Sequence, residues 1–595
     1  MEANAKRELT LRALVTGAML GVLLTPCNVY SGLKIGWSFN MSITAALLSY
    51  AFWKTLQQLR FTRPWLLLES NINQTTASSA ASIVSGGLVA PIPALTLLTG
   101  QQLSWFELIL WVFSVSFLGI WVAWFLRRQF LETASLTFPA GVATAETLND
   151  IFAHGHEAVK RVAALFSAAL LAGAVKWLDA LLTIPRLSLP FTLPGKGALA
   201  AMPGVSLKNL GFALDPSPLL VGFGAIIGLR TGVSLLLGAV LAWGVMGPSI
   251  LYRGWAQAGE SVPDAFWFAS LLEWLLWPGV ALMVMSSLMS FALLFIKSRQ
   301  PDGQRKGKQT SDQQNEITSV PVKLIFPAGF IPGLGIAFIL VAKLQILLFG
   351  IDALTAVLAV PLAFILAVVA GRVVGETGIS PIGAIGKVSQ LSFGMISPNN
   401  VVANLMTANV AGGAAGQCAD LLNDFKTGLL VGATPVYQVI AQVVGVLTGS
   451  IAGSLVYLLL IPDPAAMLIT KEWPAPAVAT WQAVAETLQH GLATIPVHAR
   501  YAALIAGIAG LLLALGEKYL PRHYGRWLPS APALGLAFII PASISIAMFI
   551  GALLAFALQR LAFSWSQRFL IACAAGLVAG ESIAGVITSA LAIVG

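Results

Sequence analysis

Charged residues are scarce in this 595-residue chain, at 10% of the total, while hydrophobic residues make up 57%. The mean hydropathy is +0.83. So few polar side chains could not cover the surface of a soluble protein of this length. The composition therefore predicts a polytopic membrane protein whose surroundings are the lipid bilayer. The net charge of +9 does not indicate nucleic-acid binding, because the basic residues are scattered over short connections between apolar runs, as membrane topology requires.

Cysteine and histidine are also scarce. The three cysteines lie in apolar segments without paired spacing, so neither a disulfide framework nor a zinc site is predicted. The five histidines fall in or near predicted loops, and we expect no metal site and no cofactor. A Walker A motif is absent, since Gly386-Lys387 is followed by Val388, which gives no support to nucleotide-driven pumping. A membrane-embedded enzyme is disfavoured for lack of a nucleophile–base pair; a passive channel is the other alternative.

The apolar runs and the basic connections between them predict a topology. The run from residue 13 follows Lys6, Arg7 and Arg12. We interpret it as a first transmembrane helix with a cytoplasmic N-terminus in the cytoplasmic (inner) membrane, rather than as a signal peptide, because many spans follow. Residues 134–152 are too polar to face lipid, which predicts a broken or re-entrant helix.

About 16 helical segments are expected, together with an outer loop at 462–498 that holds Trp473 and Trp481. The predicted spans are 13–30, 35–53, 78–99, 105–126, 160–182, 217–229, 231–251, 266–296, 324–348, 352–374, 499–516, 531–558 and 569–594, with further helices across 401–461.

The chain divides into two sequence-related halves. Residues 297–322 begin with a polar run of mixed charge and are predicted to be a cytoplasmic linker. They separate an N-terminal transmembrane half, 1–296, from a C-terminal half, 323–595. The sequence from Pro216 resembles that from Pro529, at an offset of 313 positions. Such internal duplication is typical of secondary transporters, whose sites lie between the repeats at interrupted helices.

Residues 411–438 place acidic and amide side chains in an otherwise apolar chain. In a helix, Gln417, Asp420 and Asp424 recur at i, i+3 and i+7 and share one face, with Asn423 beside Asp420. The alternative is a solvated helix end in which these acids pair with Lys426. A second copy at residues 145–150 is identical at four of six positions, at an offset of 274, and contributes the corresponding acids. These acids are Glu146 and Asp150.

Other polar side chains in predicted membrane segments also need a reason, because a charge at the centre of a membrane helix costs roughly 2.5–3.5 kcal/mol. Glu69, Asn71 and Gln74 open one segment, where a helix cap at the interface is the alternative. Lys34 lies between Gly32 and Gly36, with snorkelling as its alternative. The remaining candidates are Glu376 and the helix after it with Lys387 and Gln390, and Glu581, the single acid of the last span.

Several of these motifs resemble the oligopeptide transporter (OPT) family, most closely its prokaryotic and yellow-stripe-like branch. The resemblance rests on residues 32–38, 69–74, 136–145, 380–387 and 411–438 and extends over nearly the full chain. It implies about 16 helices from duplicated units and proton-coupled import of oligopeptides, modified peptides or metal chelates. The Asn-Pro-Gly motif of the fungal peptide-carrying branch is absent.

Together these features suggest a proton-coupled symporter that works by alternating access around a central cavity. Its substrate is an oligopeptide or a peptide-like compound, or alternatively a metal–chelate complex. The sequence leaves open whether the protein forms a homodimer. The expected substrate-binding residues are Lys34, Asn71, Gln74, Lys387, Gln390, Gln417 and Asn423. The expected proton-coupling residues are Glu69, Glu376, Asp420, Asp424, Glu146, Asp150 and Glu581.

Overall fold

The computed structural model describes residues 7–36, 38, 40–133, 136–153, 155–182, 184–194, 197–199, 204–258, 266–298, 329–377, 382–491, 495–525 and 527–594. These residues are largely helical, and 12 of their helices are long and apolar enough to cross a membrane. The predicted all-α polytopic fold is therefore confirmed. The strands named within these ranges are β1 (Thr192–Leu193) and β2 (Val205–Ser206), which pair antiparallel.

The described part of the chain contains 23 α-helices, more than the roughly 16 segments predicted, because several predicted spans are interrupted. In the N-terminal half they are α1 (Leu11–Ile35), α2 (Ser42–Gln58), α3 (Leu67–Ala81), α4 (Pro91–Thr99), α5 (Trp105–Arg127), α6 (Pro139–Ala153), α7 (Gly155–Leu182), α8 (Pro218–Ile227), α9 (Leu229–Ala239), α10 (Gly247–Tyr252) and α11 (Phe268–Ser298). In the C-terminal half they are α12 (Phe330–Phe349), α13 (Ala353–Thr377), α14 (Ile382–Ile396), α15 (Val401–Val431), α16 (Pro435–Leu460), α17 (Pro464–Met467), α18 (Pro476–His490), α19 (Val497–Tyr519), α20 (Arg522–Gly525), α21 (Ala531–Leu536), α22 (Ala542–Leu561) and α23 (Phe563–Val594).

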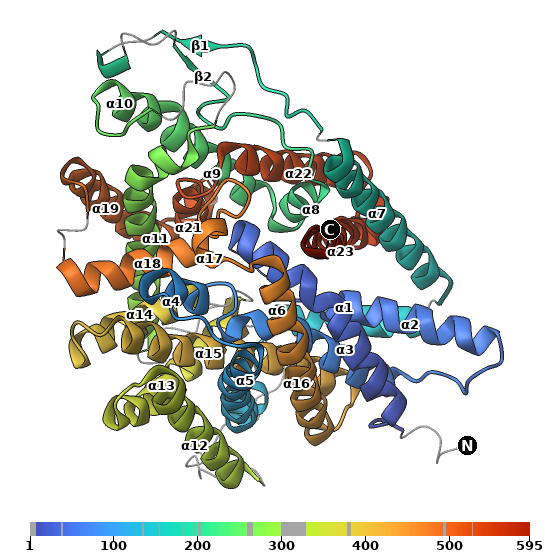
Figure 1. The fold of residues 1–595 in the computed structure, drawn as a ribbon. Coiled ribbons are helices and arrows are strands. Elements are labelled where there is room, and N and C mark those ends of the chain that lie inside the picture. Colours follow the sequence, from blue (N-terminus) through green and yellow to red (C-terminus); the bar gives the residue numbers. More distant parts are fainter. Residues whose placement is uncertain are drawn as a thin grey trace.

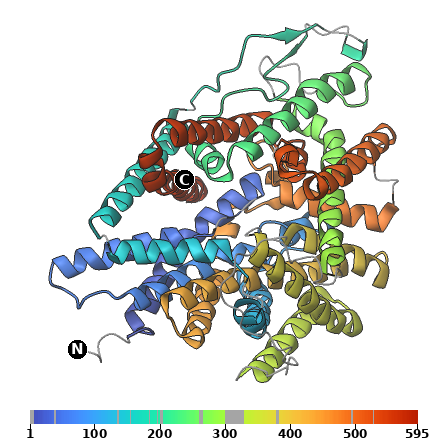
Figure 2. The same ribbon diagram turned by 180° about the vertical axis from the view of Figure 1, so that it is seen from behind.

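The helices pack into two groups, and each half of the chain contributes to both. The first helix group consists of α1–α6 and α12–α18, and the second of α7–α11 and α19–α23. Figure 1 shows most of the second group in the upper part of the view and most of the first group below it, and Figure 2 shows the same division from behind. The two groups meet where α23 contacts α1 and α16, where α7 contacts α2 and α6, and where α11 contacts α14 and α18.

Within the second helix group, helices of one half of the chain pack against helices of the other half. Helix α7 packs along α23 while α19 packs along α11, and α8 packs on α22 while α21 packs on α9. The two sequence-related segments also start their helices in the same way. Ser217 is the N-cap residue of α8 and Ser530 that of α21, and each is followed by a proline in the first turn. The sequence repeat therefore corresponds to a structural repeat.

Small residues allow these helices to approach closely. A Cβ atom added at Gly580 of α23 would overlap the carbonyl oxygen of Ala169 on α7. In the first helix group, Gly449 of α16 lies against Ala80 of α3 in the same way. Apolar burial gives membrane helices little reason to associate, because lipid is equally apolar, so close backbone packing of this kind contributes much of the association energy.

Three predicted elements were wrong in their boundaries. The span predicted at 78–99 is divided into α3, a 3-10 turn (Ser82–Gly86) and α4. The span predicted at 531–558 breaks between α21 and α22 at Pro541, which has no backbone N–H to continue a helix. The span predicted at 35–53 begins only at Ser42, because Gly36 ends α1 in the left-handed conformation at φ 76°.

The outer loop predicted at 462–498 was also wrong. Residues 476–490 form helix α18, which packs on α4, α14 and α1. Its Trp481 and the preceding Trp473 are buried, at 7% and 9% exposure. The prolines of this segment are compatible with the helix, because Pro476 occupies its first turn, where proline is well tolerated.

Candidate functional site

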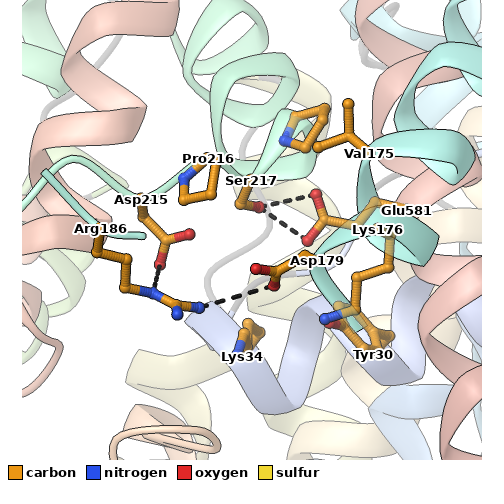
Figure 3. Close-up of a pocket in the computed structure, with 11 residues that line it drawn as sticks. Tyr30, Lys34, Val175, Lys176, Asp179, Arg186, Asp215, Pro216, Ser217 and Glu581 are labelled. Atoms are coloured by element: carbon orange, nitrogen blue, oxygen red, sulfur yellow. Dashed lines mark hydrogen bonds and ion pairs between the residues drawn. The ribbon is translucent and has the colours of Figure 1, made fainter. Parts of the chain in front are cut away.

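A cavity of about 460 Å³ lies where the two helix groups meet, a volume in the usual range for small-ligand sites. The first helix group lines it with the end of α1 and with residues 471–473. The second group lines it with α7, with the start of α22, with α23 and with the segment between α7 and α8. A narrower recess continues from it toward the start of α8 (Figure 3).

Basic side chains outnumber acidic ones in the lining of this cavity. Among the described lining residues, lysine and arginine side chains from α1, α7 and the two connecting segments contribute five cations, and Asp215 and Glu472 contribute two anions. The five are Lys34, Lys176, Arg186, Lys208 and Lys471. Two further acids, Asp179 and Glu581, line the recess. The main cavity therefore favours anionic groups on a ligand.

Arg186 lies between two carboxylates, as Figure 3 shows. Its Nη2 atom is 3.8 Å from Asp179 Oδ2 and its Nε atom is 4.0 Å from Asp215 Oδ2. Both separations are longer than a hydrogen bond, and 42% of the Arg186 side chain is exposed. The guanidinium therefore keeps donors that it can offer to a ligand.

Glu581 of α23 closes the inner end of the recess. Its side chain is 3% exposed. The hydroxyl of Ser217 donates to both of its carboxylate oxygens at 2.8 Å, and the backbone N–H of Leu219 donates to Oε2 at 2.8 Å. The carboxylate therefore sits at the N-terminus of α8, where the helix dipole stabilises an anion.

Lys34 marks the end of α1 at the cavity. Its Nζ atom donates to the carbonyl oxygen of Glu472 at 2.6 Å and lies 5.6 Å from the ring centre of Trp473. Trp473 in turn meets the Tyr30 ring edge-on at 5.3 Å. Snorkelling to a lipid interface therefore does not describe Lys34, because the ammonium group points into a protein cavity that it shares with Tyr30 and Trp473.

A second polar region lies inside the first helix group, between α3 and α15. Asp424 is 1% exposed. It accepts hydrogen bonds from Gln74 at 3.3 Å and from Ser78 and Ser42 at 3.5 Å. Asp420, one turn earlier, has the hydroxyl of Ser82 as a partner. This geometry rules out the solvated helix end considered above, and Lys426 instead donates to the carbonyl oxygen of Leu136.

Several amide groups beside these acids are buried without a hydrogen-bond partner in the described part of the chain. They include the Oε1 atoms of Gln74 and Gln417 and both amide atoms of Gln442. Gln417 Nε2 donates to Ser79 Oγ at 3.4 Å, and Ser79 Oγ donates to the backbone carbonyl oxygen of Gln442 at 3.0 Å. Buried polar atoms normally have partners, so this region can take up a further hydrogen-bonding group or water.

Glu69 lies at the opposite end of α1 from Lys34 and is tied to that helix. Its buried carboxylate forms an ion pair with Arg12 and accepts a hydrogen bond from Thr10 Oγ1 at 2.8 Å. It also accepts from the backbone N–H of Leu66 at 3.3 Å, at the start of α3. Glu69 thus caps its helix, while Asn71 and Gln74, which follow it, are fully buried.

The other predicted site residues lie in separate places. Lys387 and Gln390 on α14 are buried, and Gln390 Nε2 donates to Asn404 Oδ1 at 3.2 Å. Asn423 lies beside Asp424 and donates to the carbonyl oxygen of Ala419. Glu146 and Asp150 are exposed on α6, where Asp150 is 3.6 Å from Arg161. The side chain of Glu376 and residues 378–381 lie outside the described residues.

Sequence reasoning missed most of the residues that line the cavity. Among the described residues, Lys34 is the only predicted substrate-binding residue that lines the cavity, and Glu581, in its recess, is the only predicted proton-coupling residue there. A signal for the missing ones was present in the sequence. Lys176 and Asp179 interrupt an otherwise apolar span, and charges at membrane depth mark functional sites by default. Arg186 and Lys208 stand in the segment between the predicted spans 160–182 and 217–229.

Multiple transmembrane helices in repeated units, with a charged cavity between two helix groups, define a membrane transport protein. A family model described as "OPT oligopeptide transporter protein" matches residues 8–592. The chain therefore belongs to the OPT oligopeptide transporter family, and the predicted resemblance is confirmed.

Individual relatives align over nearly the full chain. "Putative oligopeptide transporter YGL114W" of Saccharomyces cerevisiae is 26% identical over 98% of this chain and 96% of its own length. "Putative oligopeptide transporter" of Haemophilus influenzae is 27% identical over 94% and 92%. "Probable metal-nicotianamine transporter YSL9" of Oryza sativa subsp. japonica is 26% identical over 97% and 88%. The names of the relatives thus include two kinds of substrate.

Proposed function

We propose that this protein is a secondary active transporter that imports oligopeptides or modified, peptide-like compounds together with protons. The observation that carries the proposal is the cavity of about 460 Å³ between the two helix groups of an OPT-family chain. Rocking of one group against the other would expose such a cavity to each side of the membrane in turn.

The substrate would bind in this cavity. Lys34 and Arg186 would pair with carboxylates of the ligand, while Asp215 would pair with an amino group. Six other polar residues would contact the substrate or the moving helices further along the transport path. These are Asn71, Gln74, Lys387, Gln390, Gln417 and Asn423. Gln74 and Gln417, with their unpartnered amide oxygens, are the better candidates among these.

Protons would be carried by buried carboxyl groups. Asp420 and Asp424 lie on one helix face within hydrogen-bonding reach of hydroxyl and amide groups, and Glu581 lies in the recess of the cavity. Glu69 is held by Arg12 and by the start of its own helix, which favours a structural role. Glu146 and Asp150 are exposed and fit a proton path less well.

For orientation, we propose the cytoplasmic (inner) membrane with the N-terminus in the cytoplasm. Arg12 contacts the backbone of Arg63 and Pro64 in the connection between α2 and α3, so these basic residues gather on one side, as cytoplasmic ends do. Lys34 lies 22 residues further along α1, about 33 Å away at helical rise. The cavity would then open to the outside.

The alternative substrate is a metal–chelate complex. Its support is that three relatives of rice and Arabidopsis, aligned over 85–88% of their own length, carry the name of probable metal-nicotianamine transporters. The cationic cavity suits a carboxylate-rich chelate as well as a peptide.

The test is uptake into proteoliposomes that are neutral inside and acidic outside. The outside medium holds a pool of short peptides and metal-loaded chelators, and mass spectrometry identifies what accumulates. We expect one class to accumulate above its outside concentration only while the pH gradient lasts, and Asp420→Asn to lose that accumulation. Accumulation driven by a Na⁺ gradient alone would contradict proton coupling, and equal flux without any gradient would indicate a channel.

A further inference from the structure

We infer that residues 470–474, between α17 and α18, form a hinged gate in the wall of the cavity. We call these residues the gate segment. Ile469 and Ala475 at its two ends are its hinges, and Lys34 of α1 is its latch. The inference goes beyond the proposed rocking of the two helix groups, because it assigns a local movement within the first group.

Both hinges have a left-handed backbone conformation, which residues with a side chain disfavour. The φ angle is 57° at Ile469 and 42° at Ala475. Two of the five described non-glycine residues with a positive φ therefore bracket one short segment. In this conformation the Cβ atom crowds the backbone, and a β-branched residue such as isoleucine is especially unfavourable. Strain of this kind persists only where surrounding contacts impose it, and it is typical of switch segments.

Contacts with the end of α1 hold the gate segment in its strained conformation. The Nζ atom of Lys34 donates to the carbonyl oxygen of Glu472 at 2.6 Å. The backbone N–H of Ala475 donates to the carbonyl oxygen of Leu33 at 3.0 Å. These hydrogen bonds offset the strain at the hinges, so the loss of one of them shifts the equilibrium toward a relaxed conformation of the segment.

Hydrogen bonds inside the gate segment allow it to move as a unit. The backbone N–H of Thr470 donates to the carbonyl oxygen of Trp473 at 3.1 Å, and the N–H of Trp473 donates to Thr470 Oγ1 at 3.2 Å. A β-bridge between Leu468 and Trp473 crosses the first hinge and would open with it. The internal bonds can stay intact while the backbone turns at the two ends, as is usual for hinged segments.

Movement of the gate segment would change the shape of the cavity. Three of its residues, Lys471, Glu472 and Trp473, line the cavity. The side chain of Trp473 is 9% exposed and meets the Tyr30 ring of α1 edge-on at 5.3 Å. Rotation at the hinges would separate these two rings and widen the cavity beside α1.

The latch connects the gate segment with the contents of the cavity. Lys34 lines the cavity itself, and its ammonium group is the donor to the Glu472 carbonyl oxygen. A hydrogen-bond acceptor that enters the cavity competes with this oxygen for the ammonium group. Occupancy of the cavity and the position of the gate segment are therefore linked.

Backbone hydrogen exchange of the gate segment tests the hinges and the latch. It is measured by mass spectrometry on the purified full-length protein in detergent. Ala475→Gly removes the strain at one hinge, because glycine adopts a positive φ freely, and should slow the exchange about tenfold. Lys34→Met removes the latch and should speed the exchange about tenfold. Exchange that is not slowed by Ala475→Gly, or not accelerated by Lys34→Met, would overturn the inference.

Ala537→Gly is the matched control. Ala537 is as fully buried as Ala475 and also lies between two helices, but its φ angle is −64°. Glycine there adds freedom to the unfolded chain without relieving strain, so the unfolding midpoint should fall and exchange in the gate segment should stay unchanged. Ala475→Gly should keep or raise the midpoint. An equal fall in both variants would show that Ala475 is not strained and would overturn the inference.

A cysteine in the cavity tests whether the gate segment controls access. Ser543 lines the cavity, and Ser543→Cys is labelled in detergent with a small and with a bulky maleimide, in a background without the natural cysteines. Adding Ala475→Gly should slow labelling by the bulky reagent about tenfold and leave labelling by the small one unchanged. Unchanged labelling by the bulky reagent would overturn the gating role. These measurements use neither a substrate nor a gradient, so their outcome is independent of proton-coupled transport, which the uptake experiment tests.

Discussion

At the predicted cytoplasmic end of this protein, individual side-chain contacts hold helices together, and the ion pair of Arg12 and Glu69 is the clearest example. Arg12 forms an ion pair with Glu69 and lies against the rings of Trp53 and Trp65, at 5.1 and 5.2 Å from their centres. One residue of α1 thereby holds the end of α2 and the start of α3. A charge buried as fully as Glu69 depends on that partner.

Arg12→Ala should lower the free energy of unfolding by about 2–4 kcal/mol, somewhat less than for a fully buried pair because Arg12 is partly exposed. The thermal unfolding midpoint in detergent measures this loss. Arg63→Ala, an exposed neighbour, is the control and should shift the midpoint little. Equal shifts in the two variants would show that the pair contributes no special stability.

Asp352 gives a prediction on pH dependence outside the membrane spans. Hydrogen bonds from the side chain and backbone of Thr355 lower the pKa of this carboxyl, and Thr355 N–H donates to Asp352 Oδ1 at 2.9 Å before α13 begins. A lowered pKa means that the charged form stabilises the fold. The contribution is present above the unfolded pKa of about 4 and is lost as pH falls through the folded value.

Asp352→Ala should therefore destabilise the protein by about 1 kcal/mol at neutral pH, the usual effect of a lost helix cap. At pH 3 the difference from the unaltered protein should shrink. Asp352→Asn keeps a capping oxygen without a titrating group and should remove the pH dependence alone. An unfolding midpoint difference that stays constant from pH 7 to pH 3 would contradict this account.

At the scale of helices, close contacts between the two halves hold the second helix group together. Gly551 of α22 faces α8, where an added Cβ atom would overlap the carbonyl oxygen of Val221. Gly335 of α12 has no atom within 4 Å of the corresponding position. The two glycines are thus matched in residue type and in helical setting but differ in their surroundings.

Gly551→Ala should cost about 1–3 kcal/mol of stability through overpacking, whereas Gly335→Ala should be neutral or stabilising by up to about 1 kcal/mol, since alanine favours the helix. Thermal unfolding of both variants in the same detergent checks this. A Gly551→Ala protein as stable as the Gly335→Ala protein would show that α8 and α22 are not packed as described.

Much of the fold could be predicted from the sequence because apolar runs and basic connections depend on local composition. The breaks at Gly36 and Pro541, however, come from single residues inside apolar runs, which the mean hydropathy of a run does not reveal. The burial of Trp481 depends on which helices pack together, and composition does not reveal that either. The polar face of α15 was predictable, since Gln417, Asp420 and Asp424 share it through helical spacing alone. That this face packs against polar side chains of α3 is evident only from the three-dimensional structure.

The cavity could be predicted less well, for a physical reason. Its lining comes from six separate parts of the chain, within 30–34, 175–218, 266, 471–473, 541–544 and 581–589, and only Lys34 and Glu581 among them stood out as isolated charges. Lys176 and Asp179 are separated by three positions on α7 and can be interpreted as a local pair. They lie close to Arg186 and Asp215 only because of the course that the segment between α7 and α8 takes. The sequence of that segment has no periodic pattern from which this course could be predicted.

At the scale of the whole molecule, the cavity lies between two helix groups that each draw on both halves. If the groups rock, a side chain in the cavity is accessible from one side of the membrane at a time. We predict that Ser543→Cys, which lines the cavity, reacts with a membrane-impermeant maleimide added to intact cells, in a background whose natural cysteines are replaced by serine.

Arg60→Cys, between α2 and α3, is the matched control and should react only after the cells are permeabilised. Excess ligand should protect Ser543→Cys and leave Arg60→Cys unaffected. Labelling of both positions from the same side would contradict the proposed orientation. If excess ligand does not reduce the labelling of Ser543→Cys, the cavity is not part of the transport path.

The most direct test of proton-coupled import compares accumulation with exchange in the same proteoliposomes. The unaltered protein should accumulate its ligand against a concentration gradient when the outside is acidic, and it should exchange labelled for unlabelled ligand at equal pH. Asp424→Asn should keep the exchange and lose the accumulation, because binding and rocking remain while the proton site is gone. Accumulation by Asp424→Asn at the level of the unaltered protein would contradict the assigned role of this buried acid, and accumulation by the unaltered protein that ignores the pH gradient would contradict proton coupling itself.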